Sequence, residues 1–302
     1  MRADLAMGFA TLIWGATFVT IKDALNDISV FSYLAVRFTL AGIIMAAIFW
    51  RSLHKLDRRA ARAGAQIGVF MFGGYAFQTA GMRFTTPAKA AFITGLCVVL
   101  VPLLLALFGQ RRITRWIWAG AISALAGLYF LTVPAEGLGA LNRGDPIVFG
   151  CAVMFALQII FIGRHVGQNS VGSLAFLQVA TTAVLSVLSV PLLARLGWEQ
   201  PRLALTHNAI SAILITAIGS TVIAFSCQTW AQKHTSPSHI ALLVSLEPVF
   251  ALITSWLLAR EHFGARTLMG AALVFVGILL AELKGATPAV PESPEPVIPG
   301  AR

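Results

Sequence analysis

Long apolar runs, separated by short polar segments, follow one another along almost the whole chain of 302 residues. A helix needs about 20 apolar residues to cross the ~30 Å hydrocarbon layer of a bilayer. The runs do not alternate apolar with polar, which argues against a β-barrel. Two of them, 30–50 and 237–258, qualify only if Arg37 and Glu247 are tolerated inside. The pattern predicts ten membrane-spanning helices, and the runs without Asp, Glu, Lys or Arg are 5–21, 63–82, 90–110, 116–135, 146–163, 166–194, 203–232 and 267–281.

The composition supports a membrane protein and removes several other classes. Hydrophobic residues make up 58% of the chain and charged residues 11%, whereas soluble domains have about 45–50% and about 25%. The net charge of +10 alone would suggest a nucleic-acid partner, but such proteins are rich in charge and this chain is poor in it. Three cysteines exclude a disulfide scaffold. We therefore expect an all-α integral membrane protein that lies in a lipid bilayer and binds no nucleic acid.

Basic residues gather in two predicted connections, between the second and third spans and between the fourth and fifth. Because cytoplasmic loops are enriched in Lys and Arg, this bias predicts that both termini lie on the cytoplasmic side of a bacterial inner membrane. The first run is interpreted as a retained span, since no small-residue cleavage site follows it. Residues 285–302 contain five prolines and predict a disordered cytoplasmic tail. The basic residues of the two connections are Arg51, Lys55, Arg58, Arg59, Arg62, Arg111, Arg112 and Arg115.

The chain also repeats itself, which indicates two related halves. Matches before the third span, such as Asp4 with Asp145, lie 141 residues apart, and later ones lie 150 apart. A nine-residue insertion around Arg195 to His207 would reconcile the two spacings. Five spans per half is an odd number, so we expect residues 141–284 to be inverted relative to residues 1–140, as in many transporters. The later matches are Gln78-Thr79 with Gln228-Thr229, Thr86-Pro87 with Ser236-Pro237, Gly120 with Gly270 and Gly127 with Gly277.

The glycines of the last two matches are seven residues apart within each half. That spacing puts them two turns apart on one helix face, where small residues let membrane helices pack closely. We therefore expect the fifth and tenth spans to serve mainly in packing.

Four further motifs accompany the repeat. The first span contains Trp14-Gly15 ahead of Phe18, and Glu261 precedes Gly270 and Gly277 at the entry to the tenth span. The fourth span contains Ala88-Lys89-Ala90-Ala91-Phe92-Ile93-Thr94-Gly95-Leu96 ahead of Val101-Pro102, and the ninth contains Ser245-Leu246-Glu247-Pro248-Val249-Phe250-Ala251. With them, residues 4–283 resemble the EamA family of the drug/metabolite transporter superfamily. The resemblance implies secondary transport, often export, of small metabolites such as amino acids, through a central cavity between helices 1–4 and 6–9. In one respect the halves differ, because Pro102 lies four residues beyond the position that matches Pro248. We therefore expect the fourth and ninth helices to bend at non-equivalent places.

Glu247 is the strongest candidate for a functional residue. It lies ten residues after Pro237, roughly 15 Å along a helix and close to the bilayer centre. A carboxylate there costs about 2.5–3.5 kcal/mol, so it should face a cavity or a partner. We interpret it as a group that recognises a substrate amine or couples transport to protons. The alternative is a structural carboxyl, hydrogen-bonded to backbone that Pro248 frees at a kink.

Three other charged or titratable side chains are candidates for binding or gating. Arg37 could hold a substrate carboxylate or pair with Glu247, or it could extend its head group to the outer surface. Lys89 and His239 occupy matching positions one turn into the fourth and ninth spans, where each could act as a gate group. The alternatives are interfacial roles for both. Pro102 and Pro248 complete the candidates for gating.

Amides and aromatic rings inside the spans could line the cavity. Buried amides need hydrogen-bond partners, so the glutamines either line a cavity or bond between helices. For the rings the alternative is packing or contact with lipid. No HExxH spacing and no phosphate-binding glycine motif occurs, so we expect no metal and no other cofactor. The residues in this group are Gln78, Gln158, Gln178, Gln228, Trp14, Tyr75 and Phe155.

The sequence as a whole favours a secondary transporter that exports small polar or amphipathic solutes by alternating access. Proton coupling and uncoupled flow both stay open, as do a monomer and a homodimer. The competing hypotheses are an integral membrane transferase, a multidrug efflux pump of the same fold, and a passive channel or scaffold. Membrane enzymes usually cluster His, Asp or Glu at the membrane edge, whereas the acidic residues here are sparse and scattered.

Overall fold

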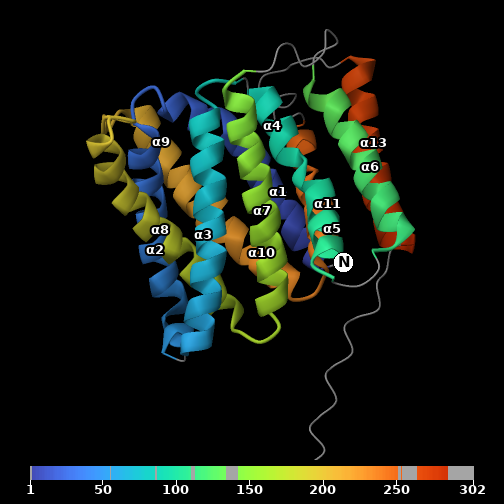
Figure 1. Cartoon of the computed structure of the whole chain (residues 1–302), viewed down its shortest axis with the longest axis horizontal. Coiled ribbons are helices and arrows are strands. Elements are labelled where there is room, and N and C mark those ends of the chain that lie inside the picture. The colour runs from blue at the N-terminus through green and yellow to red at the C-terminus, as the bar shows by residue number, and fades with distance from the viewer. Residues whose placement is uncertain are drawn as a thin grey trace, which may run out of the picture.

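Helices form all of the regular structure in the described part of the chain, apart from one isolated β-bridge. The computed structural model describes residues 2–54, 56–85, 87–109, 113–133, 142–250, 253 and 264–284. The predicted tail 285–302 and the side chain of Lys89 lie outside the described residues. Figure 1 shows how the helices are arranged. They are α1 (Arg2–Ala24), α2 (Val30–Leu53), α3 (Arg58–Gly81), α4 (Pro87–Gly95), α5 (Cys97–Leu107), α6 (Arg115–Thr132), α7 (Gly144–His165), α8 (Val171–Arg195), α9 (His207–Ile215), η1 (Thr216–Ile223), α10 (Ala224–Gln232), α11 (Pro237–Val244) and α13 (Ala265–Lys284).

Several of these helices are long and apolar enough to cross a membrane. Among the described residues, 4 meet both criteria: α2, α7, α8 and the continuous helical stretch His207–Gln232. Shorter apolar helices cover Phe92–Leu107, Arg115–Leu131, Pro237–Phe250 and Ala265–Ala281. The finding agrees with a multi-pass membrane protein.

The stretch from α9 to α10 contains a π-helix, η1, in its middle. The wider π turn brings the Thr221 hydroxyl to the carbonyl of Thr216, five residues earlier, at 2.9 Å. Short π segments inside α-helices are rare and occur often at functional sites. No feature of the sequence pattern predicted this one.

The two broken helices bend at matching positions. The amide of Leu96, between α4 and α5, donates to Ile93 O, and the amide of Leu246, after α11, donates to Leu243 O, each at 3.1 Å. These residues are 150 apart, so the expectation of non-equivalent bends is wrong. Pro102 lies inside α5 and does not end it. Pro248 favours the second break, because a proline has no N–H to donate and its ring clashes with the carbonyl of Val244.

The glycine pairs of α6 and α13 bring the two backbones together, as the sequence predicted. A Cβ atom at Gly120 would lie 2.5 Å from the carbonyl oxygen of Gly277, and one at Gly127 would lie 2.6 Å from that of Gly270. Any larger side chain would therefore push the helices apart. The two helices lie side by side at one edge of the molecule (Figure 1).

The first and second halves of the chain are interleaved. Helix α2 packs on α8, α3 packs on both α7 and α8, and α1 packs on α10. Each of these contacts joins a helix before residue 140 to a helix after it. The interior between the halves is where the candidate site lies.

Candidate functional site

A cavity lies between helices of both halves. Its volume is about 610 Å³, including space that is open to solvent. Its walls come from α1, α2, α3, the α4–α5 break, α7, the η1–α10 segment and the end of α11, whereas α6 and α13 contribute none of its lining residues. All the predicted binding residues except Gln178 line it: Trp14, Arg37, Tyr75, Gln78, Phe155, Gln158, Gln228 and Glu247.

Arg37 enters the cavity from α2 with a side chain that is held on several sides. Its Nε donates to Thr221 Oγ1 at 3.0 Å and its Nη2 to Tyr75 Oη at 3.4 Å. The guanidinium carbon lies 4.7 Å from the ring centre of Tyr75 and 5.1 Å from that of Phe38. The residue is only 1% exposed, so the alternative in which its head group extends to the outer surface is wrong.

The π-helix supplies the hydroxyl that fixes Arg37. Thr221 Oγ1 accepts the Arg37 N–H and donates its own proton to the carbonyl of Thr216. The Thr216 hydroxyl lies 2.8 Å from Tyr33 Oη, which connects η1 back to α2. These bonds leave the guanidinium little rotational freedom, and Arg37 lines the cavity in this orientation.

Glu247 is the first residue after the second helix break and lines the same cavity. Within the described part of the chain its carboxylate makes no hydrogen bond and no ion pair. The predicted pairing with Arg37 is therefore not found, because Arg37 directs its donors to Thr221 and Tyr75 instead. The alternative of a carboxyl bonded to freed backbone is likewise not found among these residues. Two opposite charges thus face one cavity without contacting each other.

Three of the four predicted glutamines form one buried network. Gln158 Nε2 donates to Gln178 Oε1 at 3.0 Å and to Gln228 Oε1 at 3.2 Å. Gln178 Nε2 continues the network to Thr229 Oγ1 at 3.0 Å. Gln178 is not a lining residue itself, but it is hydrogen-bonded to Gln158, which is. Gln78 lines the cavity and makes no hydrogen bond among the described residues.

Aromatic rings form much of the remaining wall. The ring centres of Tyr75 and Phe155 lie 5.2 Å apart, and so do those of Trp14 and Phe225. Trp14 also donates its indole N–H to the carbonyl of Ser220 in η1 at 2.9 Å. The predicted Trp14, Tyr75 and Phe155 are therefore cavity-lining rings.

Several lining residues were missed by sequence reasoning. Cys97 is one, although it matches Glu247 at the 150-residue spacing and follows the first break as Glu247 follows the second. The adjacent polar pair Ser220-Thr221 inside an apolar run was a signal that could have been used. The missed lining residues include Thr17, Thr94, Ser220 and Val244.

Of the predicted gate groups whose side chains the structure describes, His239 is not among the residues that line this cavity. His239 Nε2 lies 2.9 Å from Asp4 Oδ1, so the pair joins the start of α11 to the start of α1. Pro102 and Pro248 are not among the lining residues either. No three His, Cys, Asp or Glu side chains within the described ranges are grouped to hold a metal ion.

Comparison with known proteins places this architecture in a family. The family model of the EamA-like transporter family matches residues 1–133 and 142–283. The chain belongs to the EamA-like transporter family. This EamA-family chain is 32% identical to an uncharacterized transporter of Archaeoglobus fulgidus over 284 residues, covering 94% of the chain and 87% of that relative. It is 21% identical to the uncharacterized transporter YoaV of Bacillus subtilis, covering 93% and 96%.

A crystal structure with 22% sequence identity superposes on the EamA-family chain with a TM-score of 0.77. The match covers 93% of this chain and 96% of the other. At that identity the likeness shows the fold alone. The family and the names of the relatives establish a transporter of the drug/metabolite type, and they identify no solute.

Proposed function

We propose that the protein is a secondary transporter that exports small zwitterionic or amphipathic metabolites, such as amino acids, across a bacterial inner membrane. The observation that carries this proposal is the arrangement of Arg37 and Glu247. Both line one cavity, and neither neutralises the other. A solute with a carboxylate and an amine would complement both charges at once.

The energetics support such a solute. A charged group inside a membrane protein that has no counter-ion retains part of its desolvation cost, on the order of several kcal/mol, because its lost hydration is only partly replaced. A zwitterion brings one opposite charge to each group and recovers part of that cost. The rings of Trp14, Tyr75 and Phe155 would then contact its apolar portion.

The proposed architecture is ten spans arranged as two inverted five-helix repeats, 1–140 and 141–284. The family model matches the chain in two segments, which supports two repeats. Helix α2 (Val30–Leu53), shifted by 141 residues, nearly coincides with α8 (Val171–Arg195). The matching breaks at Leu96 and Leu246 add support at the later spacing. Rocking of such halves around a central cavity would give alternating access.

Glu247 is the proposed site of proton coupling. Its carboxylate lines the cavity and makes no hydrogen bond or ion pair with the described residues, so it can exchange a proton with either the solute or water. We propose further that both termini are cytoplasmic, on the basis of the Lys and Arg bias. The protein would act as a monomer or a homodimer.

The test is transport by purified protein in liposomes, with amino acids as solutes and an imposed pH gradient. The proposal expects wild-type protein to move a zwitterion, and Glu247→Gln to lose the response to the gradient. Asp23→Asn removes an exposed carboxylate from α1 and serves as the matched control. If Glu247→Gln leaves transport and its pH dependence unchanged, the coupling role is wrong. Transport of hydrophobic cations without a carboxylate would favour the multidrug alternative.

A further inference from the structure

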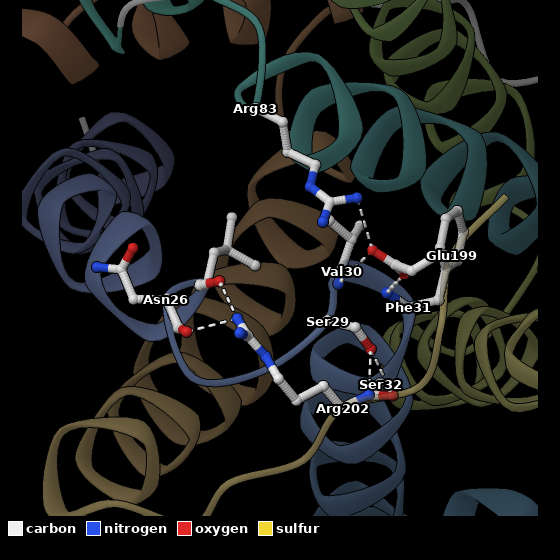
Figure 2. A network of polar contacts seen from close by, with 9 residues as sticks. Asn26, Ser29, Val30, Phe31, Ser32, Arg83, Glu199 and Arg202 are labelled. Atoms are coloured by element: carbon white, nitrogen blue, oxygen red, sulfur yellow. Dashed lines mark hydrogen bonds and ion pairs between the residues drawn. The ribbon is translucent and has the colours of Figure 1, made fainter.

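The nine-residue insertion predicted in the second half is the loop between α8 and α9, and it is folded against other connections. The amide of Ser29 donates to Arg202 O at 2.9 Å, and the amide of Ala204 donates to Asp27 O at 3.2 Å. An antiparallel bridge pairs Ile28 with Leu203. We call residues 196–206 the strap. Figure 2 shows it lying against the turn that joins α1 to α2.

Glu199 of the strap is fixed by the start of α2. Its two carboxylate oxygens accept the amides of Val30 at 3.1 Å and Phe31 at 3.0 Å. A carboxylate at a helix N-terminus satisfies unpaired N–H groups and the positive end of the helix dipole. Glu199 Oε1 also accepts from Arg83 Nη1 at 2.9 Å (Figure 2).

The two partners of this ion pair differ in exposure. The Glu199 side chain is 9% exposed, whereas that of Arg83 is 50% exposed. Arg83 lies in the connection from α3 to α4, and Thr85 of the same connection donates to Asp145 of α7 at 3.0 Å. The Arg83 contact thus joins the α3–α4–α7 side to the strap. Because the Arg83 side chain is already half exposed, the ion pair with Glu199 can break without moving a buried guanidinium into water.

The helix ends joined by the strap lead directly into the cavity. Arg202 donates to the carbonyls of Leu25 and Asn26, and Ile21, four residues before Leu25, lines the cavity. Gln78, five residues before Arg83, lines it too. These two lining residues lie within two helix turns of the residues that contact the strap. Movement of the end of α1 relative to the end of α3 would therefore alter the cavity lining.

We propose that the strap is a latch: Arg83 bound to Glu199 holds this end of the cavity closed, and release of Arg83 opens it. The inference rests on the alternating access of the proposed function. The matching connection in the first half, from α2 to α3, covers only residues 54–57, so it has no segment of comparable length. The backbone contacts of the strap stay in place while the exposed ion pair breaks.

The test measures access to Cys97, which lines the cavity, and needs no known solute. In full-length protein with Cys151→Ala and Cys227→Ala, Cys97 is labelled by a membrane-impermeant maleimide in spheroplasts and in inside-out vesicles. Leu203→Cys in a protein without other cysteines identifies the side on which the strap lies. We expect Arg83→Gln to raise the labelling rate from that side by roughly twofold to fivefold, the range of a partly exposed ion pair.

Two further variants separate a latch from a structural role. Arg83→Lys keeps the charge and should restore much of the wild-type labelling rate. Arg59→Gln removes an exposed arginine at the other end of α3 and should leave the rate unchanged. The latch would be overturned if Arg83→Gln left the labelling rate of Cys97 unchanged. It would also be overturned if a lowered melting temperature of that variant accounted for the faster labelling. Labelling and transport are separate readouts, so an altered rate in a protein that moves no amino acid would contradict the proposed function alone.

Discussion

Arg37 Nε lies 3.0 Å from Thr221 Oγ1, and this contact joins the cavity arginine of α2 to a π-helix in the second half of the chain. The hydroxyl can accept from Arg37 because it donates its own proton to Thr216, five residues back. The contact orients the guanidinium in a cavity where Glu247 supplies the opposite charge. The π-helix therefore has a specific consequence for the proposed binding of a carboxylate.

Thr221→Val should weaken the binding of solutes that carry a carboxylate. Valine keeps the shape of threonine but removes the hydrogen bond to the guanidinium, a bond worth about 1.5–3 kcal/mol when one partner is charged. We expect a rise of roughly tenfold or more in the Michaelis constant for a zwitterion. The check is initial-rate transport in liposomes, with Thr221→Ser as the variant that restores the hydroxyl. Equal Michaelis constants for the valine variant and the wild type would contradict the positioning role.

Gly127→Ala should destabilise the protein through the contact of α6 with α13. The new Cβ would lie 2.6 Å from Gly270 O, so the helices must separate, at a cost of about 1–3 kcal/mol. Gly8→Ala in α1 meets nothing within 4 Å and is the matched control, which should be neutral or slightly stabilising. Thermal unfolding in detergent measures both. A melting temperature of the Gly127 variant equal to that of the control would disprove close packing here.

Gln158→Leu should lower both stability and transport. The substitution removes the donor to Gln178 and Gln228, and each unpaired buried acceptor costs about 1–3 kcal/mol. Gln168→Leu changes an exposed amide just after α7 and should have little effect. Melting curves together with liposome transport test the prediction. It would be wrong if the two variants behaved alike.

The sequence predicted much of the site because a charged residue inside an apolar run must face a cavity or a polar partner. Arg37 and Glu247 were costly inside spans, and a cavity between the halves was the expected solution. The glycine faces of α6 and α13 followed from spacing alone. The repeat located the strap as an insertion, although its fold and its Glu199 contacts could not be read from that length difference.

The remainder depended on contacts between distant segments. The π-helix has no marker in local propensity, because the polar residues of Thr216–Ile223 indicate a polar contact but not a wider helical turn. The break at Leu96 occurs without a proline at the matching position, where Val98 stands, so proline was a misleading guide to where the helices bend. Likewise, the pairing of Arg37 with Thr221 instead of Glu247 is set by tertiary packing.

The most direct test of the account is solute counterflow in liposomes with amino acids, their amides, which lack the carboxylate, and their deaminated acids, which lack the amine. We predict that wild-type protein exchanges a zwitterion and discriminates against both analogues. Arg37→Gln should lose the discrimination against the amide, and Glu247→Gln should lose that against the deaminated acid. Unchanged selectivity in both variants, or folded wild-type protein that exchanges no zwitterion, would contradict the claim that these two residues bind opposite ends of the transported solute.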